Sequence, residues 1–476
     1  MEARAVRGNL LGTLRKAAPF VVAAVLLASA LMGPEVPGLG HEGKATVAIL
    51  LVAVVLWVSE ALPLAITALL MLVAMPLCGV CSYEDAFANS IGSTVFFLLG
   101  PFAFTVALDA TSIPTRIAGA VLAWSGTSSR KMLFGLMAAV AALSTVMSDV
   151  AACGVFISVG KRLLELNGEK AGSSSLGKAL MMGIPWASYA GGCAVMTGNG
   201  CNVLAVDLFR DLFGVEVTFA QWFILGAPVA VAMLVVAWAA LTTVFRTEPL
   251  KEEALELIVS EARACGPLMR AEKATLIVIG AALIGWVVSS WVPFVNTALV
   301  AVLALAALSL PGCCVLDFRT LLSRMNWGVI LMIMSVMSVA HFIVVTGAGQ
   351  WFVDGVVALV PAGLHTATGM LLAASVAGCL IHGVVPVGPA VAAVLAFPLG
   401  SLAGDYGISV AAMVMVVAWQ ASISYLLPLD CVPVLTYGYG YYTMADMVRV
   451  GWIPSVVLVA LSVTLLPALC AFLGMP

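Results

Sequence analysis

Polar side chains with the chemistry of a cation site lie together inside apolar sequence. Ser144, Ser148 and Asp149 interrupt one long apolar run. The two serines are four residues apart, so in a helix they share one face. Their hydroxyls, the Asp149 carboxylate and the backbone carbonyl of Gly198 supply the oxygen ligands that hard cations prefer. The pattern predicts a Na⁺ site, because a carboxylate in such surroundings is costly and usually functional.

Each titratable residue in the apolar sequence has more than one possible role. Asp149 can instead cap the helix that follows it, with the serines bonding back to helix carbonyls. Asp430 lies between Pro428 and Pro433, where it can ligate a cation, carry a proton or cap a half-helix. His382 can be a structural donor, a proton carrier or an anion ligand.

Two apolar spans are interrupted by glycine, proline and polar residues. The first break, 197–202, reads TGNGCN and follows the glycine pair 191–192; the second, 428–433, reads PLDCVP. Unwound backbone exposes carbonyls to a cation, and the N-terminus of a half-helix attracts an anion. Asn199 and Asn202 are therefore predicted ligands, with the role of turn residues as the alternative.

The composition places these residues in a membrane. The chain has 476 residues, of which 63% are hydrophobic and 9% are charged, whereas a soluble domain is about 45–50% apolar and about 25% charged. This excludes a soluble enzyme and a disordered chain, and the alternating pattern of a membrane barrel is missing. The net charge of −3 provides no basic surface for nucleic acid. We expect an all-α polytopic membrane protein.

Apolar runs predict about 11 transmembrane helices, two of them broken. They cover residues 17–33, 45–62, 63–80, 93–110, 179–208, 220–245, 274–292, 296–311, 327–346, 410–436 and 450–472. Two further runs, 132–160 and 369–399, are too long for one crossing and too short for two. Helix-interrupting residues in their middles, Ser148-Asp149 and Gly388-Pro389, predict two re-entrant hairpins.

The distribution of basic residues predicts the orientation. With a cytoplasmic N-terminus and two hairpins, only Lys44 and Arg210 of the 21 lysines and arginines fall outside. This layout puts the C-terminus outside and suits the cell (inner or plasma) membrane. A cleavable signal peptide is the alternative for the first run. Tryptophans near span ends are predicted interface anchors: Trp57, Trp222, Trp291 and Trp327.

The order of elements repeats with opposite orientation. Residues 218–226 and 443–451 share the pattern T-x-A-x5-G, and each opens the last span after a hairpin and an interrupted span. Such an inverted-topology repeat is common in secondary transporters. The predicted units are scaffold spans of the first repeat (1–131), its transport elements (132–245), a cytoplasmic linker (246–273), scaffold spans of the second repeat (274–368) and its transport elements (369–476).

Several motifs resemble those of the divalent anion:sodium symporters, which carry di- and tricarboxylates or sulfate. Residues 56–64, LWVSEALPL, resemble that family's W-[IV]-[ST]-E-A-[IL]-P motif. The glycine pair 191–192 followed by 198–202 resembles its G-G…G-T-P-P-N loop. Residues 427–430 resemble the second such loop, and 327–328 resemble the start of its ninth span. The resemblance covers nearly the whole chain.

The resemblance implies a homodimer in which a transport domain moves like an elevator against a scaffold. In that family each hairpin tip usually reads Ser-Asn-Thr and holds substrate carboxylate and sodium. Here the tips read Ser148-Asp149-Val150 and Gly388-Pro389-Ala390, and Val434 replaces the second loop's asparagine. The first sodium site is thus retained with Asp149 in it, and the second has lost its side-chain ligands.

Together these features predict a Na⁺-coupled secondary transporter of small divalent organic anions. C4-dicarboxylates are the first candidate substrates. The alternatives are a proton-coupled carrier, a cation-independent anion exchanger, or a carrier of sulfate, citrate or tartrate. With four histidines and no H-E-x-x-H motif, neither an enzyme nor a cofactor is expected. The predicted substrate residues are Ser148, Asp149, Asn199, Asn202, Gly388, Pro389, Ala390 and His382. The predicted cation residues are Ser144, Ser148, Asp149, Gly198 and Asp430.

Overall fold

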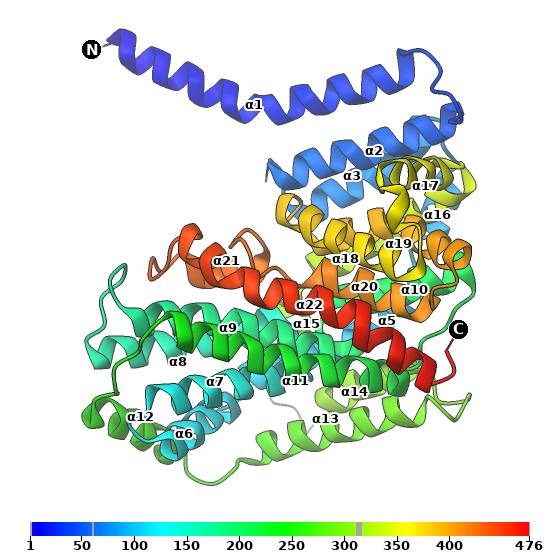
Figure 1. Ribbon diagram of the computed structural model, residues 1–476. Coiled ribbons are helices and arrows are strands. Elements are labelled where there is room, and N and C mark those ends of the chain that lie inside the picture. Colours follow the sequence, from blue (N-terminus) through cyan, green and yellow to red (C-terminus); the bar gives the residue numbers. More distant parts are fainter. Residues whose placement is uncertain (1, 60, 311–316, 476) are drawn as a thin grey trace.

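The protein is a bundle of helices that run side by side, with the two termini at opposite ends (Figure 1). The computed structural model describes residues 2–59, 61–310 and 317–475. Within these ranges the chain forms helices and no strand. The predicted all-helical class is therefore confirmed. Glu60, part of the 56–64 motif, and residue 311, the predicted end of one span, lie outside the described residues.

Each continuous span predicted from the sequence corresponds to a helix. These helices are α1 (Glu2–Met32), α2 (His41–Val58), α3 (Leu64–Leu77), α5 (Ser93–Asp109), α11 (Phe219–Val244), α13 (Arg270–Val288), α14 (Thr297–Ser309), α16 (Trp327–Val345) and α22 (Met444–Phe472). Among the described residues, eight helices, two of which are hairpin arms, have the length and composition to cross a membrane. Short helices join the spans: α4 (Tyr83–Ala88), α15 (Phe318–Arg324) and α17 (Ala348–Leu359).

Two helical hairpins lie where the sequence predicts them, and both are longer than predicted. The first consists of α7 (Ser129–Ser144) and α8 (Asp149–Asn167), and the second of α18 (Ala367–Val384) and α19 (Gly388–Tyr406). The two arms of each hairpin pack against each other. The tips are short: residues 145–148 and 385–387 separate the arms.

Two spans are broken, and each packs against the hairpin of its own half and against one arm of the other half's hairpin. The first comprises α9 (Ser175–Ala194), a 3-10 turn (Met196–Gly198) and α10 (Gly200–Phe213). The second comprises α20 (Val410–Ser422) and α21 (Cys431–Tyr437), separated by residues 423–430. The arm α19 packs against α10, and the arm α8 packs against α21. This exchange brings both tips and both breaks together.

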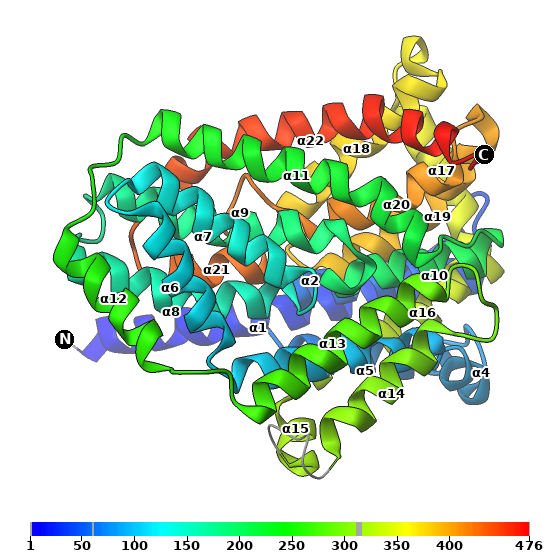
Figure 2. The same ribbon diagram turned by 90° about the horizontal axis from the view of Figure 1, so that it is seen from below.

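The repeated T-x-A-x5-G pattern has the same start in both halves. Thr218 forms a capping box with Gln221 at the start of α11, and Thr443 forms one with Asp446 at the start of α22. A capping box satisfies backbone N–H groups that a helix start leaves free. The two helices also pack against each other along their lengths (Figure 2).

The glycine of each pattern lies against the break of its own half. A Cβ on Gly226 would lie 2.5 Å from the carbonyl oxygen of Cys193, and a Cβ on Gly451 would overlap the carbonyl oxygen of Tyr425. Only a residue without a side chain permits so close an approach. The repeat thus fixes α11 against the last turn of α9, just before the first break, and α22 against the segment 423–430.

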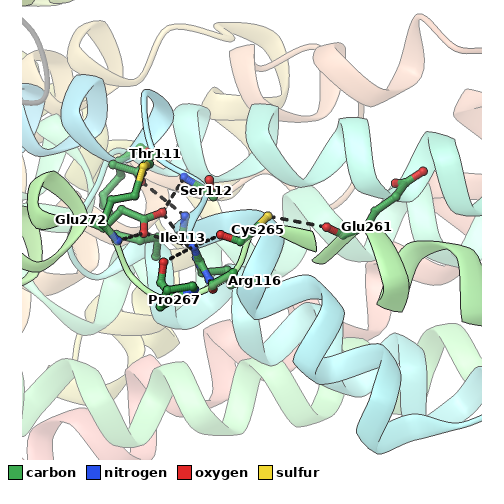
Figure 3. A network of polar contacts seen from close by, with 11 residues as sticks. Thr111, Ser112, Ile113, Arg116, Glu261, Cys265, Pro267 and Glu272 are labelled. Carbon is green, nitrogen blue, oxygen red and sulfur yellow. Dashed lines mark hydrogen bonds and ion pairs between the residues drawn. The ribbon is translucent and has the colours of Figure 1, made fainter. Parts of the chain in front are cut away.

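The linker between the halves is anchored to the first half. Its helix α12 (Glu252–Ala264) packs against α6 (Ile113–Ser125) and α8. Arg116 of α6 contacts the carbonyls of three consecutive linker residues, 265–267, and pairs with the buried Glu272 of α13 at 3.2 Å (Figure 3). Glu272 also accepts from the backbone N–H of Ser112 at 3.1 Å. The buried carboxylate is paired and hydrogen-bonded, as burial of a charge requires.

The prediction of tryptophan anchors is wrong for two of the four residues. Trp57 is 1% exposed and Trp222 is 0% exposed, whereas Trp291 and Trp327 are 70% and 44% exposed. The indole N–H of Trp57 donates to the Leu64 carbonyl, and that of Trp222 donates to the Cys193 carbonyl. Each of these two buried tryptophans therefore links the ends of two helices inside the fold.

Candidate functional site

One cavity of about 400 Å³ is lined by both hairpin tips and both breaks. The tips contribute 148–150 and 386–389, and the breaks contribute 199–201, 421–422 and 430–431. The opposite wall comes from α5, the start of α3 and the start of α16: Pro63, Leu64, Ala65, Phe102, Asn326, Gly328, Val329 and Met332. Segments far apart in the sequence thus enclose one site.

Helix N-termini, and not basic side chains, supply positive potential to this cavity. Its lining, within the described chain, includes no lysine, arginine or histidine. The helices α8, α10, α16 and α19 all begin at or beside lining residues. Asn199 and Asn326 cap α10 and α16 with their side chains, whereas the N-cap residues of α8 and α19 at the two hairpin tips make no side-chain cap. In the first turn of α8, the Asp149 carboxylate accepts from the Val150 N–H. Backbone N–H groups and the helix dipole favour an anion at such ends.

The predicted cation ligands of the first half converge on Gly192. A Cβ placed on this glycine would lie 3.5 Å from Asp149 Cβ, 3.5 Å from the Gly198 carbonyl oxygen and 3.6 Å from Ser144 Oγ. The first break and the first tip therefore meet around a backbone without a side chain. The Ser144 hydroxyl and the Gly198 carbonyl thus lie beside the same glycine as the base of the Asp149 side chain, and such oxygens are the ligands that a hard cation prefers.

The hydrogen bonds of Asp149 hold its carboxylate at the edge of the cavity. One oxygen accepts from the backbone N–H of Val150 at 2.8 Å, and the other accepts from Asn199 Nδ2 at 2.5 Å. Ser148 Oγ lies 3.4 Å from the first oxygen. The hydroxyl of Ser144 donates to the Ser188 carbonyl at 2.7 Å, which leaves its lone pairs for a cation.

Three of the predicted substrate residues, Asn202, Ala390 and His382, lie outside the cavity lining. Asn202 donates its amide to the carbonyls of Gly192 and Val195 at 2.8 and 3.0 Å, so it holds the break in shape. Ala390 is fully buried within α19. Gly388 and Pro389 line the cavity, and Gly388 lies so close to Ala421 and Cys201 that a Cβ would overlap both.

Asp430 closes the second break and joins three elements. Its carboxylate caps α21 by accepting from the Val432 N–H at 3.3 Å. It also accepts from the hydroxyl of Tyr189 at 2.6 Å, and His382 Nε2 lies 3.4 Å away. His382 Nδ1 lies 2.6 Å from the Gln420 carbonyl. Asp430 lines the cavity, and His382 lies behind it.

Three polar residues at the site were not found from the sequence. Tyr189 contacts Asp430, a residue 241 positions away, so no local pattern reveals it. Thr105 accepts from the backbone N–H of Ser148 at 3.2 Å, across a separation of 43 residues. Asn326 directly precedes the 327–328 motif, and its place just before a helix start is a usable signal for an N-cap.

The fold and the site define a polytopic membrane transporter, with a central cavity between paired hairpins and broken helices. Residues 14–475 match the family described as the sodium:sulfate symporter transmembrane region. The chain belongs to this family. Its members are transporters and not enzymes, and the predicted family is therefore confirmed.

Individual relatives agree with this membership. The chain is 27% identical over 435 residues to a membrane protein of Cupriavidus necator, covering 86% of this chain and 83% of that protein. It is 29% identical over 258 residues to the sodium-dependent dicarboxylate transporter SdcS of Staphylococcus saprophyticus, covering 52% of this chain. This match spans half the length of that transporter.

A solved structure has the same fold. The YdaH transporter of Alcanivorax borkumensis aligns with a TM-score of 0.54 at 15% identity, covering 91% of this chain and 99% of that chain. At this identity the likeness concerns the arrangement of helices alone.

Proposed function

We propose that the protein imports small divalent organic anions together with Na⁺, and that C4-dicarboxylates are its main substrates. The observation that carries this proposal is the cavity in which the helix N-termini of both hairpin tips lie beside the Asp149 carboxylate. A dicarboxylate needs positive potential at both ends, and the two hairpin tips each present a helix N-terminus. The dicarboxylate transporter SdcS is among the relatives.

Sodium is the proposed coupling ion because the cavity lining carries carboxylates and no basic side chain. Asp149 and Asp430 both line it. A dianion placed beside them is repelled unless a cation intervenes. A Na⁺ held by Ser144, Asp149 and Gly198 would neutralise Asp149 and draw the substrate to the first tip. Binding of the ion then becomes a condition for binding of the anion.

The proposed mechanism is an elevator movement. The cavity has one wall from the hairpins and broken helices and another from α3, α5 and α16. If the first group slides along the second, the site reaches each side of the membrane in turn. The proposal includes a homodimer, as the family resemblance implies, with the N-terminus cytoplasmic and the C-terminus outside, as the distribution of basic residues favours.

Uptake into liposomes tests the proposal. Purified full-length protein is reconstituted, and accumulation of labelled succinate is measured with an inward Na⁺ gradient, with equal Na⁺ and with K⁺ alone. We expect accumulation only with the gradient. Uptake that ignores Na⁺ but needs internal anion would identify an exchanger instead. Competition by sulfate, citrate and tartrate at equal concentration ranks the substrates, and a better competitor than succinate would replace it as the proposed substrate.

A further inference from the structure

A buried cluster behind the cavity joins the second hairpin to both broken spans. His382 lies on α18, Asp430 at the second break and Tyr189 on α9, with exposures of 1%, 5% and 1%. Tyr189 donates to one carboxylate oxygen of Asp430 at 2.6 Å, and His382 Nε2 lies 3.4 Å from the other. Of the three, Asp430 lines the cavity. The carboxyl group therefore lies between His382 and the cavity.

The hydrogen-bond partners of His382 determine how many protons His382 and Asp430 hold together. A carbonyl oxygen only accepts hydrogen bonds, so the 2.6 Å contact with the Gln420 carbonyl places a hydrogen on Nδ1. With Nδ1 protonated, a neutral imidazole offers a lone pair at Nε2. Two acceptors facing each other, Nε2 and a carboxylate oxygen, would repel. The observed contact is attractive when one further proton lies on Nε2 or on Asp430.

We propose that the His382–Asp430 pair is a proton-binding site that carries one proton with the substrate, in addition to Na⁺ at Asp149. This inference rests on the proposed function. With its proton the pair is electrically neutral, and without it the cavity gains a negative charge beside the dianion. The step is a proton transfer alone: cavity water delivers H⁺ to the pair on one side of the membrane, and water accepts it on the other.

The second tip offers fewer ligands for a metal cation than the first tip does. Residues 385–389 read VPVGP and offer no side-chain oxygen. The first tip, in contrast, supplies Ser148 and Asp149 to its cage. Tyr189 is a positioning residue here: its hydrogen bond orients the Asp430 carboxyl toward His382.

Few other titratable groups surround the pair. The α-helices packed against α18 are α19, α20 and α22. Apart from His382, α18 carries Cys379, α19 carries Asp405 and Tyr406, and α22 carries Asp446, Arg449 and Cys470. Near Asp430 lie Tyr189 and, in the shared cavity, Cys201, Cys431 and Asp149. The carboxylates of α19 and α22 lie elsewhere. Asp405 is 17 residues beyond Gly388, roughly 25 Å along the helix. Asp446 is paired with Lys178 at 2.9 Å.

Uptake under a pH gradient tests the proposal. Liposomes with equal Na⁺ on both sides receive labelled succinate with and without an inside-alkaline step of one pH unit. One coupled proton raises wild-type accumulation by up to about tenfold. We expect this ratio to fall to one in His382→Gln and Asp430→Asn, and to persist in the control His341→Gln, whose histidine is exposed on α16. A wild-type ratio in His382→Gln would overturn the proposal.

A second measurement does not depend on transport. Full-length protein labelled with ¹⁵N-histidine has four imidazoles, and the signal lost in His382→Gln identifies His382. We expect the ¹⁵N signal of its Nε2, which reports whether a proton is bound there, to differ between wild type and Asp430→Asn at the same pH. Identical signals would contradict a shared proton. If no anion is taken up under any gradient, the proposed transport function fails, and this spectrum still decides whether the pair binds a proton.

Discussion

Asp149 combines a carboxylate, two hydrogen bonds and a place near other side-chain and backbone oxygens. Its carboxylate accepts from Val150 and Asn199, and Ser144 Oγ and the Gly198 carbonyl lie around the same glycine. The variant Asp149→Asn keeps the size and removes the charge. We expect the Na⁺ concentration for half-maximal uptake to rise at least about tenfold, a loss of about 1.4 kcal/mol of binding free energy. Initial uptake rates over a range of Na⁺ concentrations measure this.

Asp109→Asn is the matched control for this prediction. Asp109 is the exposed last residue of α5. The control should keep the Na⁺ dependence of the wild type. Should Asp149→Asn also keep it, Asp149 serves only to stabilise the start of α8, and the cation site must lie elsewhere. Thermal unfolding of both variants checks that they are folded.

Single residues were predictable where their type conflicted with their surroundings. A carboxylate in apolar sequence, such as Asp149 or Asp430, is conspicuous without any structure. Tyr189 is not, because a tyrosine in an apolar helix is an ordinary residue until its partner is known. Asn202 shows the opposite case: an asparagine is a suitable ligand by type, but its amide donates to two backbone carbonyls at the break.

At the scale of elements, the glycine of each repeat sets how closely a last span approaches its break. Gly451 lies against the Tyr425 carbonyl, five residues before Asp430. In Gly451→Val, α22 or the break must move. Such overpacking costs about 1–3 kcal/mol, so the unfolding temperature in detergent should fall by several degrees. Uptake should fall as well, because the second break moves with Asp430.

Gly280→Val provides the comparison for this element. Gly280 lies within α13, and a Cβ on it would meet nothing within 4 Å. The same change of side chain there should leave the unfolding temperature and uptake near wild type. Equal behaviour of the two variants would show that the close approach at Gly451 is not required.

The existence of the hairpins was predictable from the sequence, and their lengths were not. Hydrophobicity marks only the part of an arm in apolar surroundings. The arm α8 continues seven residues beyond the predicted end at 160, through Lys161, Arg162 and Glu165. Lys161 and Glu165 pair on its exposed surface at 3.7 Å. The packing of each hairpin against the other half's broken span could not be predicted either, because sequence order does not specify which elements pack together.

At the scale of the whole molecule, the cavity lies where two groups of helices meet, and an elevator requires them to slide. Gly200 begins α10 in the proposed transport group, and a Cβ on it would lie 3.6 Å from Val329 Cγ1 of α16 in the proposed scaffold. The double variant Gly200→Cys/Val329→Cys places two sulfurs within bonding reach. We expect oxidation to stop uptake and reduction to restore it, measured on the same reconstituted sample.

A cross-link within the scaffold separates sliding from general stiffening. A Cβ on Gly285 of α13 would lie 3.7 Å from Val300 Cβ of α14, a spacing that suits a disulfide. Oxidised Gly285→Cys/Val300→Cys should transport as the wild type does, because both helices belong to the same group. Uptake that survives the first cross-link would show that α10 and α16 stay together during transport. The site would then open by movement of the hairpin tips alone, with the broken helices fixed.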